Sequence, residues 1–438
     1  MASDRPGASS AMDEDTLLAM AWHIVGRLEE RGWRAYLVGG CVRDRLLGRP
    51  LKDVDIATSA RPEDVMALFE RTEPTGLAHG TVTVILKGKP FEVTTFRTES
   101  GYSDGRRPDA VRFIDDIEQD LARRDFTVNA MALAKDGRLV DPFGGRRDLE
   151  NRILRAVGDP RLRFEEDALR MLRAIRFAAE YGLSIEPATW RAIVAMAPRI
   201  GLIATERVRM ELERITEGRD PARGYRLLKE SGLAGHFRTP LPLERLPDDT
   251  RAALGRLTET GDGTVRWIRL FAALGCESGE AAGLMRRLTF SNRRTEDIST
   301  ALAFGAGAGS LAGRTDDGAS RAFKRLVLRH GPQAARRWLD AAALAPDADG
   351  AFLDAARRWL TDMPARELKE LAAGGRDLIA AGLAPGPAVG RLLERLLERV
   401  ALGELANRRE LLIGEALKMA RDGLAQDGPA GREEGESR

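Results

Sequence analysis

The chain has only two cysteines, Cys41 and Cys276, among its 438 residues. Two cysteines cannot form a disulfide framework, so a reducing compartment such as the cytoplasm is expected. Long apolar runs are also missing, and no stretch approaches the roughly 20 residues that a membrane-spanning helix needs. Residues 1–15 are small and acidic and lack the charged-then-apolar order of a signal peptide. The sequence therefore predicts a cytoplasmic protein without a membrane segment.

Excess charge of one sign is absent too, because 69 Lys and Arg residues oppose 67 Asp and Glu residues. Most of the basic residues are arginine, whose planar guanidinium suits phosphate recognition, although GC-rich coding would give the same bias. Residues 281–340 carry a local basic excess that could follow a polyanion. Candidate contacts there, each of which could equally belong to a solvated helix face, are Arg286, Arg287, Arg293, Arg294 and Lys324.

Hydrophobic patterning divides the chain into an α+β region and a long helical region. Strands are predicted at 36–38, 54–57, 81–86, 91–96, 127–132 and 139–140, with a hairpin turn over 87–90. Helices are predicted at 16–31, 42–47, 62–71, 165–181, 187–197, 206–217 and 221–231. Further helices follow residue 240, interrupted by loops at 305–314 and 345–350. A mixed, largely antiparallel sheet followed by helices is the expected architecture.

Two aspartates one residue apart are the most informative feature of the sequence. In the strand expected there, side chains alternate between faces, so Asp53 and Asp55 share one face. Two carboxylates on one face repel each other unless a cation lies between them, and oxygen ligands suit Mg²⁺. Upstream, the strand at 36–38 runs through two glycines into a helix beginning near Cys41, and a helix N-terminus is an anion site. A metal pair beside a phosphate-binding turn indicates phosphoryl or nucleotidyl transfer.

Six motifs together resemble, in family order, those of the class II tRNA nucleotidyltransferase and poly(A) polymerase family. The resemblance runs from residue 36 to about residue 233, nearly half the chain. Each motif alone is weak evidence, because glycine pairs and DxD pairs are common, but six in order are specific. They are LVGGCVRD at 37–44, KDVDIA at 52–57, GLAHGTVTV at 76–84, FEVTTFR at 91–97, RRDFTVNA at 123–130 and EDALRMLRAIRF at 166–177.

The resemblance implies a nucleotidyltransferase-fold head followed by an all-α neck, body and tail. It also implies tRNA as the partner, bound by its acceptor arm and 3′ end, with CTP and ATP as substrates and no protein partner. The expected divisions are a disordered start at 1–12, the head at 13–150, a neck with the nucleotide-selecting helix at 151–240, a tRNA-binding body and tail at 241–424, and a disordered end at 425–438.

The resemblance further implies that Asp53 and Asp55 are catalytic and hold Mg²⁺. Glu92 is a candidate third carboxylate, as metal ligand or base, or else a surface glutamate. Gly40 and Arg43 fit triphosphate binding, because glycine permits close backbone approach and arginine adds charge.

Three residues of the RRDFTVNA motif extend this set. Arg124 matches the family arginine that contacts the incoming nucleotide. Arg123 could equally be the partner of Asp120. Asn129 either binds the sugar or serves as a structural amide.

Base selection is expected from Asp167 and Arg170, which lie three residues apart in the helix predicted over 165–181 and should stand side by side. Cytosine and adenine both present an amine beside an unprotonated ring nitrogen, so one acceptor and one donor match both bases. Uracil and guanine reverse both polarities and would leave polar groups unpaired. Arg173 and Arg176 continue at intervals of three and could orient the base-reading pair or meet phosphates.

Residues 97–113 resemble the flexible loop of full CCA-adding enzymes, which helps to switch the pocket from CTP to ATP. The favoured hypothesis is a Mg²⁺-dependent, template-independent enzyme that adds C, C and A to tRNA and releases pyrophosphate. The alternatives are a poly(A) polymerase, a partial enzyme adding only CC or only A, and a catalytically silent RNA-binding protein. The intact pair of Asp53 and Asp55 disfavours the silent protein.

Overall fold

The computed structural model describes residues 14–101 and 110–423. The chain divides into two compact units, Met1–Leu243 and Glu244–Arg438. This division falls just beyond residue 240, where the neck was expected to end, and the other expected divisions stay predictions. The ends predicted to be disordered, 1–12 and 425–438, lie outside the described residues.

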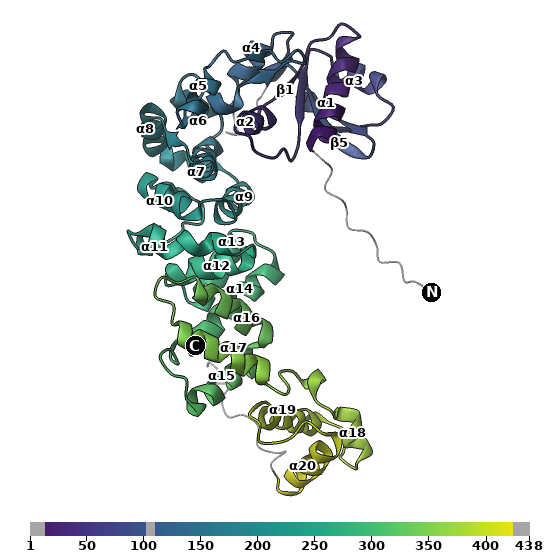
Figure 1. Ribbon diagram of the computed structural model, residues 1–438, viewed down its shortest axis with the longest axis vertical. Coiled ribbons are helices and arrows are strands. Elements are labelled where there is room, and N and C mark those ends of the chain that lie inside the picture. The colour runs from purple at the N-terminus through teal and green to yellow at the C-terminus, as the bar shows by residue number, and fades with distance from the viewer. Residues whose placement is uncertain (1–13, 102–109, 424–438) are drawn as a thin grey trace, which may run out of the picture. The chain divides into compact units, whose positions relative to one another are not determined.

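The first unit is built on a seven-stranded mixed sheet with strand order β3-β4-β5-β2-β1-β8-β9 (Figure 1). Within the described residues its neighbouring strands are antiparallel, except that β2 and β5 run parallel. The expectation of a mixed, mostly antiparallel sheet is confirmed. The strands are β1 (Ala35–Val38), β2 (Asp55–Thr58), β3 (Thr72–Gly76), β4 (Thr81–Leu86), β5 (Lys89–Thr95), β8 (Ala132–Leu133) and β9 (Leu139–Val140).

Two small sheets stand beside the main one. They pair β6 (Arg97–Ser100) with β7 (Ala110–Phe113), and β10 (Ile153–Leu154) with β11 (Ser184–Ile185).

The predicted hairpin joins β4 and β5. Its turn residues, Lys87 and Gly88, both have positive φ angles (48° and 77°), as tight hairpin turns require. Along β4 and β5 the apolar residues Val82, Val84 and Val93 are buried, which anchors the hairpin register in the core.

Helices cover this sheet and extend beyond it. The helix α1 packs on β1, and α3 packs on β4 and β5 (Figure 1). The helices α7, α9 and α10 pack on one another. The helices of the first unit are α1 (Glu14–Glu29), α2 (Gly40–Leu46), α3 (Pro62–Leu68), α4 (Ile117–Ala122), α5 (Gly145–Glu150), α6 (Pro160–Glu166), α7 (Leu169–Tyr181), α8 (Pro187–Met196), α9 (Thr205–Thr216) and α10 (Pro221–Ser231).

The prediction of one helix over 165–181 was wrong. The backbone of Asp167 is extended (φ −147°, ψ 104°), so α6 ends before it and α7 begins after it. The Asp167 carboxylate accepts the Leu169 N–H at 3.0 Å. Aspartate competes with helical bonding in this way, because its short side chain can cap the next helix.

The prediction of a strand over 127–132 was also largely wrong. Residues Thr127–Asn129 form a 3₁₀ turn, and pairing begins only at Ala132. The reason is a set of buried side-chain hydrogen bonds, from Thr127 to Asp148 at 2.7 Å and from Asn129 to Asp125 at 3.1 Å.

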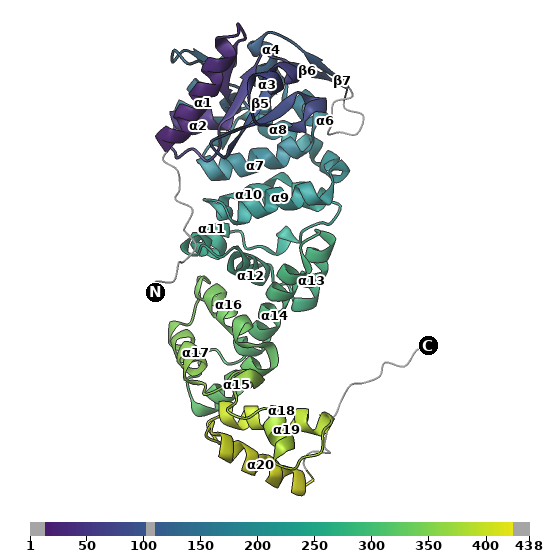
Figure 2. The ribbon, with the colours of Figure 1, turned by 90° about the vertical axis from the view of Figure 1, so that its right-hand side faces the viewer.

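The second unit is helical throughout its described part (Figure 2). Its helices are α11 (Thr250–Leu254), α12 (Gly263–Ala273), α13 (Ser278–Arg287), α14 (Asn292–Gly309), α15 (Asp317–His330), α16 (Pro332–Ala343), α17 (Gly350–Asp362), α18 (Gly375–Ala380), α19 (Pro387–Ala401) and α20 (Arg409–Arg421). None of the helices in the described ranges combines the length and apolarity that a bilayer span requires.

One loop prediction in this unit was partly wrong. The loop expected over 305–314 begins only after α14 ends at Gly309, whereas the loop at 345–350 separates α16 from α17 as expected. The glycines in α14 serve close packing, because a Cβ on Gly305 would lie 2.2 Å from Nε1 of Trp338.

A glycine contact beneath the 3₁₀ turn generates a stability prediction. A Cβ on Gly145, in α5, would lie 2.2 Å from the carbonyl oxygen of Thr127. We expect Gly145→Ala to lower the free energy of unfolding by about 1–3 kcal/mol, because the backbone must shift. Urea unfolding would measure this, with Gly235→Ala as the control, since no atom lies within 4 Å of its Cβ position. An unchanged midpoint for Gly145→Ala would contradict the packing argument.

Candidate active site

A cavity of about 530 Å³ in the first unit brings together every predicted site residue except Glu92. Its walls come from the turn after β1, the start of β2, the segment around Arg124, and α7. The predicted residues in its lining are Gly40, Arg43, Asp53, Asp55, Arg124, Asp167, Arg170, Arg173 and Arg176, and the lining also includes Gly39, Arg123, Asp125, Asn129, Leu169, Phe177, Tyr181 and Arg207.

The sheet positions the carboxylates at one end of this cavity. Antiparallel pairing sets Val38 opposite Asp55, so the glycine turn after β1 and the Asp55 carboxylate lie at the same sheet end. Asp53 precedes the paired part of β2 but still lines the cavity with Asp55. The parallel pairing of Ile56 with Val93 brings Glu92 next to Asp55, although Glu92 does not line the cavity.

Asp55 carries an electrostatic penalty in this arrangement. Water reaches its side chain, yet the surrounding protein desolvates the carboxyl, and Glu92 and Asp53 add negative charge. These effects raise the pKa of Asp55 to about 6, against the lowering effect of Arg124. Carboxylates held together against their own repulsion are typical of a cation site.

The donor set fits a divalent cation that takes further ligands from elsewhere. Across residues 14–101 and 110–423, no group of three or more His, Cys, Asp or Glu side chains could hold a metal alone. A cation bound by Asp53 and Asp55 would therefore complete its coordination with other oxygens, such as those of a phosphate-bearing substrate.

The glycine turn stands against Arg124. Gly39 has φ 73°, and a Cβ there would lie 2.8 Å from Nη1 of Arg124. The conformational requirement thus falls on Gly39, one residue before the predicted Gly40. Arg124 makes only long bonds, of 3.4 Å each, to the Asn129 carbonyl and to Asp120, and its buried Nε has no partner among the described residues. Arg124 therefore has N–H groups to offer a ligand.

Arg43 is much more fully engaged than Arg124. It donates to both carboxylate oxygens of Asp44 at 3.0 Å, to Oδ1 of Asn129 at 2.5 Å, and to the Tyr181 hydroxyl. Its guanidinium also lies 4.1 Å from the centre of the Tyr181 ring. Because a guanidinium has five N–H groups, Arg43 retains little donor capacity for a triphosphate. Its predicted role stays a prediction.

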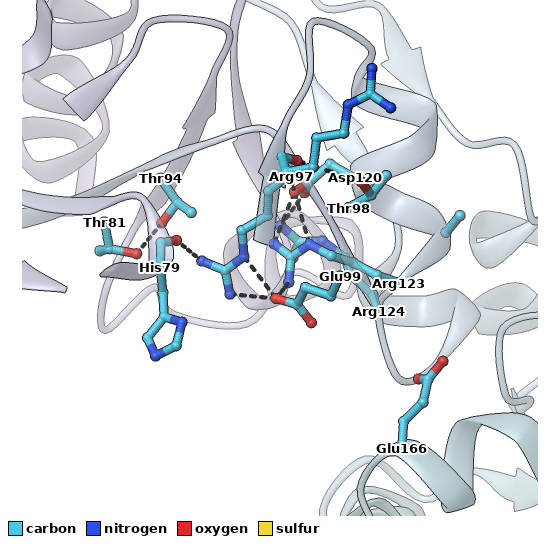
Figure 3. Close-up of polar contacts among 12 residues, drawn as sticks. His79, Thr81, Thr94, Arg97, Thr98, Glu99, Asp120, Arg123, Arg124 and Glu166 are labelled. Carbon is cyan, nitrogen blue, oxygen red and sulfur yellow. Dashed lines mark hydrogen bonds and ion pairs between the residues drawn. The ribbon is translucent and has the colours of Figure 1, made fainter. Parts of the chain in front are cut away.

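An ion-pair network supports Arg123 and Arg124 from the side of β6 (Figure 3). Buried Asp120 accepts from Arg123 at 2.9 Å, as one alternative for Arg123 predicted. Arg123 also donates to Glu99 at 3.1 Å, and Glu99 accepts from Arg97 at 2.7 Å. The network fixes this wall of the cavity in place.

Asp167 and Arg170 both line the cavity, but not from one helix as predicted. Arg207, on α9, holds the Asp167 carboxylate through two hydrogen bonds, at 2.7 and 3.2 Å. Arg170 donates to Glu166 at 2.5 Å and to the backbone carbonyl of Arg123 at 3.1 Å. Each member of the expected base-reading pair thus has its own partner.

Arg173 and Arg176 also find carboxylates on other segments. Arg173 donates to Asp125 at 2.6 and 2.9 Å, and Arg176 donates to Glu211 at 2.6 Å. Burial alone would raise the pKa of Asp125, but Arg173 and hydrogen bonds lower it to about 2. These pairs hold α7 against its neighbours.

Sequence reasoning missed Arg207, Tyr181 and Glu211. Arg207 and Glu211 lie four residues apart on α9 and therefore share one face. An Arg–Glu pair at that spacing in a predicted helix was the available signal. Nothing local to Tyr181 indicates its contact with Arg43.

Family models match most of the chain. The Poly A polymerase head domain matches residues 35–155, the "Probable RNA and SrmB- binding site of polymerase A" matches 182–240, and the tRNA nucleotidyltransferase domain 2 matches 259–416. The mixed sheet, its carboxylates and the head-domain match define a nucleotidyltransferase.

Similar proteins narrow this class. A CCA-adding enzyme of Limosilactobacillus fermentum is 41% identical over 90% of this chain and 96% of its own length. One from Geobacillus stearothermophilus is 39% identical over 88% and 93%. The crystal structure of the Bacillus stearothermophilus CCA-adding enzyme in complex with CTP has 36% identity and a TM-score of 0.78, covering 94% of this chain and 99% of that one. The chain belongs to the class II CCA-adding enzyme family, whose nucleotidyltransferase chemistry indicates a divalent metal.

The strained carboxylates predict a trade-off between stability and metal binding. In metal-free buffer at pH 7.5, we expect Asp55→Asn to raise the free energy of unfolding by about 1 kcal/mol. One pKa unit corresponds to about 1.36 kcal/mol, and water in the cavity screens part of the effect. Because folding raises this pKa, the penalty arises as Asp55 ionises, so the gain should vanish below about pH 4.

Thermal melting with and without a divalent metal measures both effects. Metal should raise the melting temperature of the wild type and leave Asp55→Asn unchanged. Equal stabilisation of both proteins by metal would contradict a metal role for Asp55.

Proposed function

We propose that this protein adds CCA to the 3′ ends of tRNA, using CTP and ATP and releasing pyrophosphate. The observation that carries the proposal is one cavity joining Asp53 and Asp55 to Asp167 and Arg170. The carboxylates serve transfer chemistry, and the other pair serves base selection. The names of the relatives and the bound CTP of the similar crystal structure support the same substrates. A cytoplasmic location, consistent with two free and buried thiols, is part of the proposal.

The triphosphate end of the site is proposed to lie beside the glycine turn. Gly39 and Gly40 let phosphate oxygens approach the backbone, and the uncommitted N–H groups of Arg124 neutralise them. Asp53 and Asp55 would hold Mg²⁺, which when bound neutralises the triphosphate and stabilises the leaving pyrophosphate. Glu92, as a third negative charge beside Asp55, is proposed to favour cation binding there.

The base end of the site is proposed to lie at the break between α6 and α7. A carboxylate offers about four acceptor positions, and Arg207 and the Leu169 N–H occupy three on Asp167. One acceptor position remains for an exocyclic amine.

Arg170 complements that acceptor. Its contacts with Glu166, with the carbonyl of Arg163 and with the carbonyl of Arg123 engage three of its five N–H groups. The remaining N–H groups can donate to an unprotonated ring nitrogen, as cytosine and adenine provide. Uracil and guanine would leave buried groups unpaired, at a cost of roughly 1–3 kcal/mol each.

The predicted switch from CTP to ATP concerns a segment outside the described residues. Most of the flexible loop expected within 97–113 falls in residues 102–109, and only its flanking strands β6 and β7 are described. Its role as a lever, and the expectation that deleting 101–105 impairs A addition more than C addition, stay predictions.

Primer extension tests the proposed function directly. A tRNA transcript lacking CCA should receive two C residues and one A, with no incorporation from UTP or GTP. Asp53→Asn should lower incorporation at least about 1,000-fold, because metal stabilisation of the transition state is worth several kcal/mol. It should still bind tRNA in a gel-shift assay. A poly(A) polymerase would add A without C, a partial enzyme would add only CC or only A, and a silent protein would add nothing.

Loss of Arg207 should relax base selection without removing the chemistry. In Arg207→Ala, the Asp167 carboxylate loses two charge-assisted hydrogen bonds, so we expect discrimination between CTP and UTP to fall about tenfold. The ratio of kcat/KM values for the two nucleotides measures this effect. Arg209→Ala is the control, because Arg209 lies on the same helix, pairs with Glu213 and does not line the cavity. Unchanged discrimination in Arg207→Ala would contradict a positioning role.

A further inference from the structure

A second cavity, of about 720 Å³, adjoins the nucleotide cavity in the first unit. The two cavities share Arg176 and Tyr181 in their linings. Lys52, which lines the second cavity, directly precedes Asp53, which lines the first. The second cavity therefore opens next to the catalytic carboxylates. Its lining is Lys52, Arg176, Glu180, Tyr181, Met210, Glu213, Arg214, Glu217, Gly218 and Arg219.

We propose that this second cavity receives the 3′-terminal nucleotides of the RNA primer. The proposal rests on the proposed function, which requires two substrates to meet at Asp53 and Asp55. The first cavity holds the base-reading and triphosphate groups, so the primer must arrive from another side. The second cavity supplies that approach, and its volume is in the range that suits a nucleotide-sized ligand.

The charges of the second cavity suit a phosphate backbone. Lys52 and Arg219 are exposed, and within the described residues their side chains make no ion pair. The acidic side chains there are already engaged. Glu180 accepts from Arg49 at 2.7 Å and from the Arg219 backbone N–H at 3.0 Å, and Glu213 accepts from Arg209 at 2.6 Å. Uncommitted cations beside neutralised carboxylates leave a net attraction for phosphate.

An apolar contact for a base completes the cavity. Met210 is 45% exposed although it lies on a helix whose neighbours Val208 and Leu212 are buried. A thioether makes favourable contacts with aromatic rings, and unpaired RNA ends are recognised by contacts to their exposed bases. The Tyr181 ring is covered by the guanidinium groups of Arg43 and Arg49, at 4.1 and 4.5 Å. Met210 is therefore the side chain that the cavity offers to a base.

Steady-state kinetics with a tRNA transcript lacking CCA tests the proposal. The double variant Lys52→Gln/Arg219→Gln should raise KM for the transcript about tenfold and leave KM for CTP unchanged, because two phosphate contacts are lost. The salt dependence of log KM should fall by about one unit of slope for each contact. Arg191→Gln, an exposed arginine on α8 outside both cavities, is the matched control and should behave as the wild type.

The outcomes separate the two proposals. If the wild type adds no C to the transcript, the proposed function fails. If the wild type is active and the double variant keeps its KM for the transcript, only the primer cavity is refuted, and equal changes in both KM values also refute it. Should the double variant melt at lower temperature, Met210→Ala decides, because removing an exposed side chain spares the fold. It should raise KM for the transcript severalfold, and an unchanged value would overturn the proposal.

Discussion

The fold holds Asp53, Asp55 and Glu92 close together while supplying Arg124 as a nearby but loosely bonded cation. Hydrophobic burial sustains this repulsion, because the alternate residues Val54 and Ile56 are fixed in the core of the sheet. Strand alternation then forces the aspartates toward the cavity. The stored repulsion is relieved when a cation binds, so the same sheet that stabilises the head also provides the driving force for metal binding.

Ion pairs between segments organise the rest of the cavity. Arg173 reaches Asp125 in the head motif, and Arg176 reaches Glu211 on α9. Both carboxylates are buried, so removing either partner would leave a charge without compensation. These pairs therefore fix the position of α7 more strictly than apolar packing alone would, and they hold the base-reading end at a defined distance from the carboxylates.

Local patterns in the sequence predict much of this structure. Alternating apolar residues predicted β4 and β9 with their observed bounds, and a proline start predicted α10. Failures occur where side chains bond across long sequence distances. The 3₁₀ turn at Thr127 depends on Asp148, and the placement of Asp167 depends on Arg207. Apolar periodicity carries no information on such polar pairs, so the site residues could be named from motifs while their partners could not.

The break at Asp167 shows why those partners matter for selection. In an unbroken helix, Asp167 and Arg170 would stand three residues apart on one face and would pair with each other. Their mutual ion pair would consume the acceptor and the donor that a base edge requires. The extended backbone at Asp167 prevents this, and Arg207 and Glu166 hold the two groups separately. Each group then keeps unused hydrogen-bonding capacity directed by a fixed partner, which is the condition for reading a base without a nucleic-acid template.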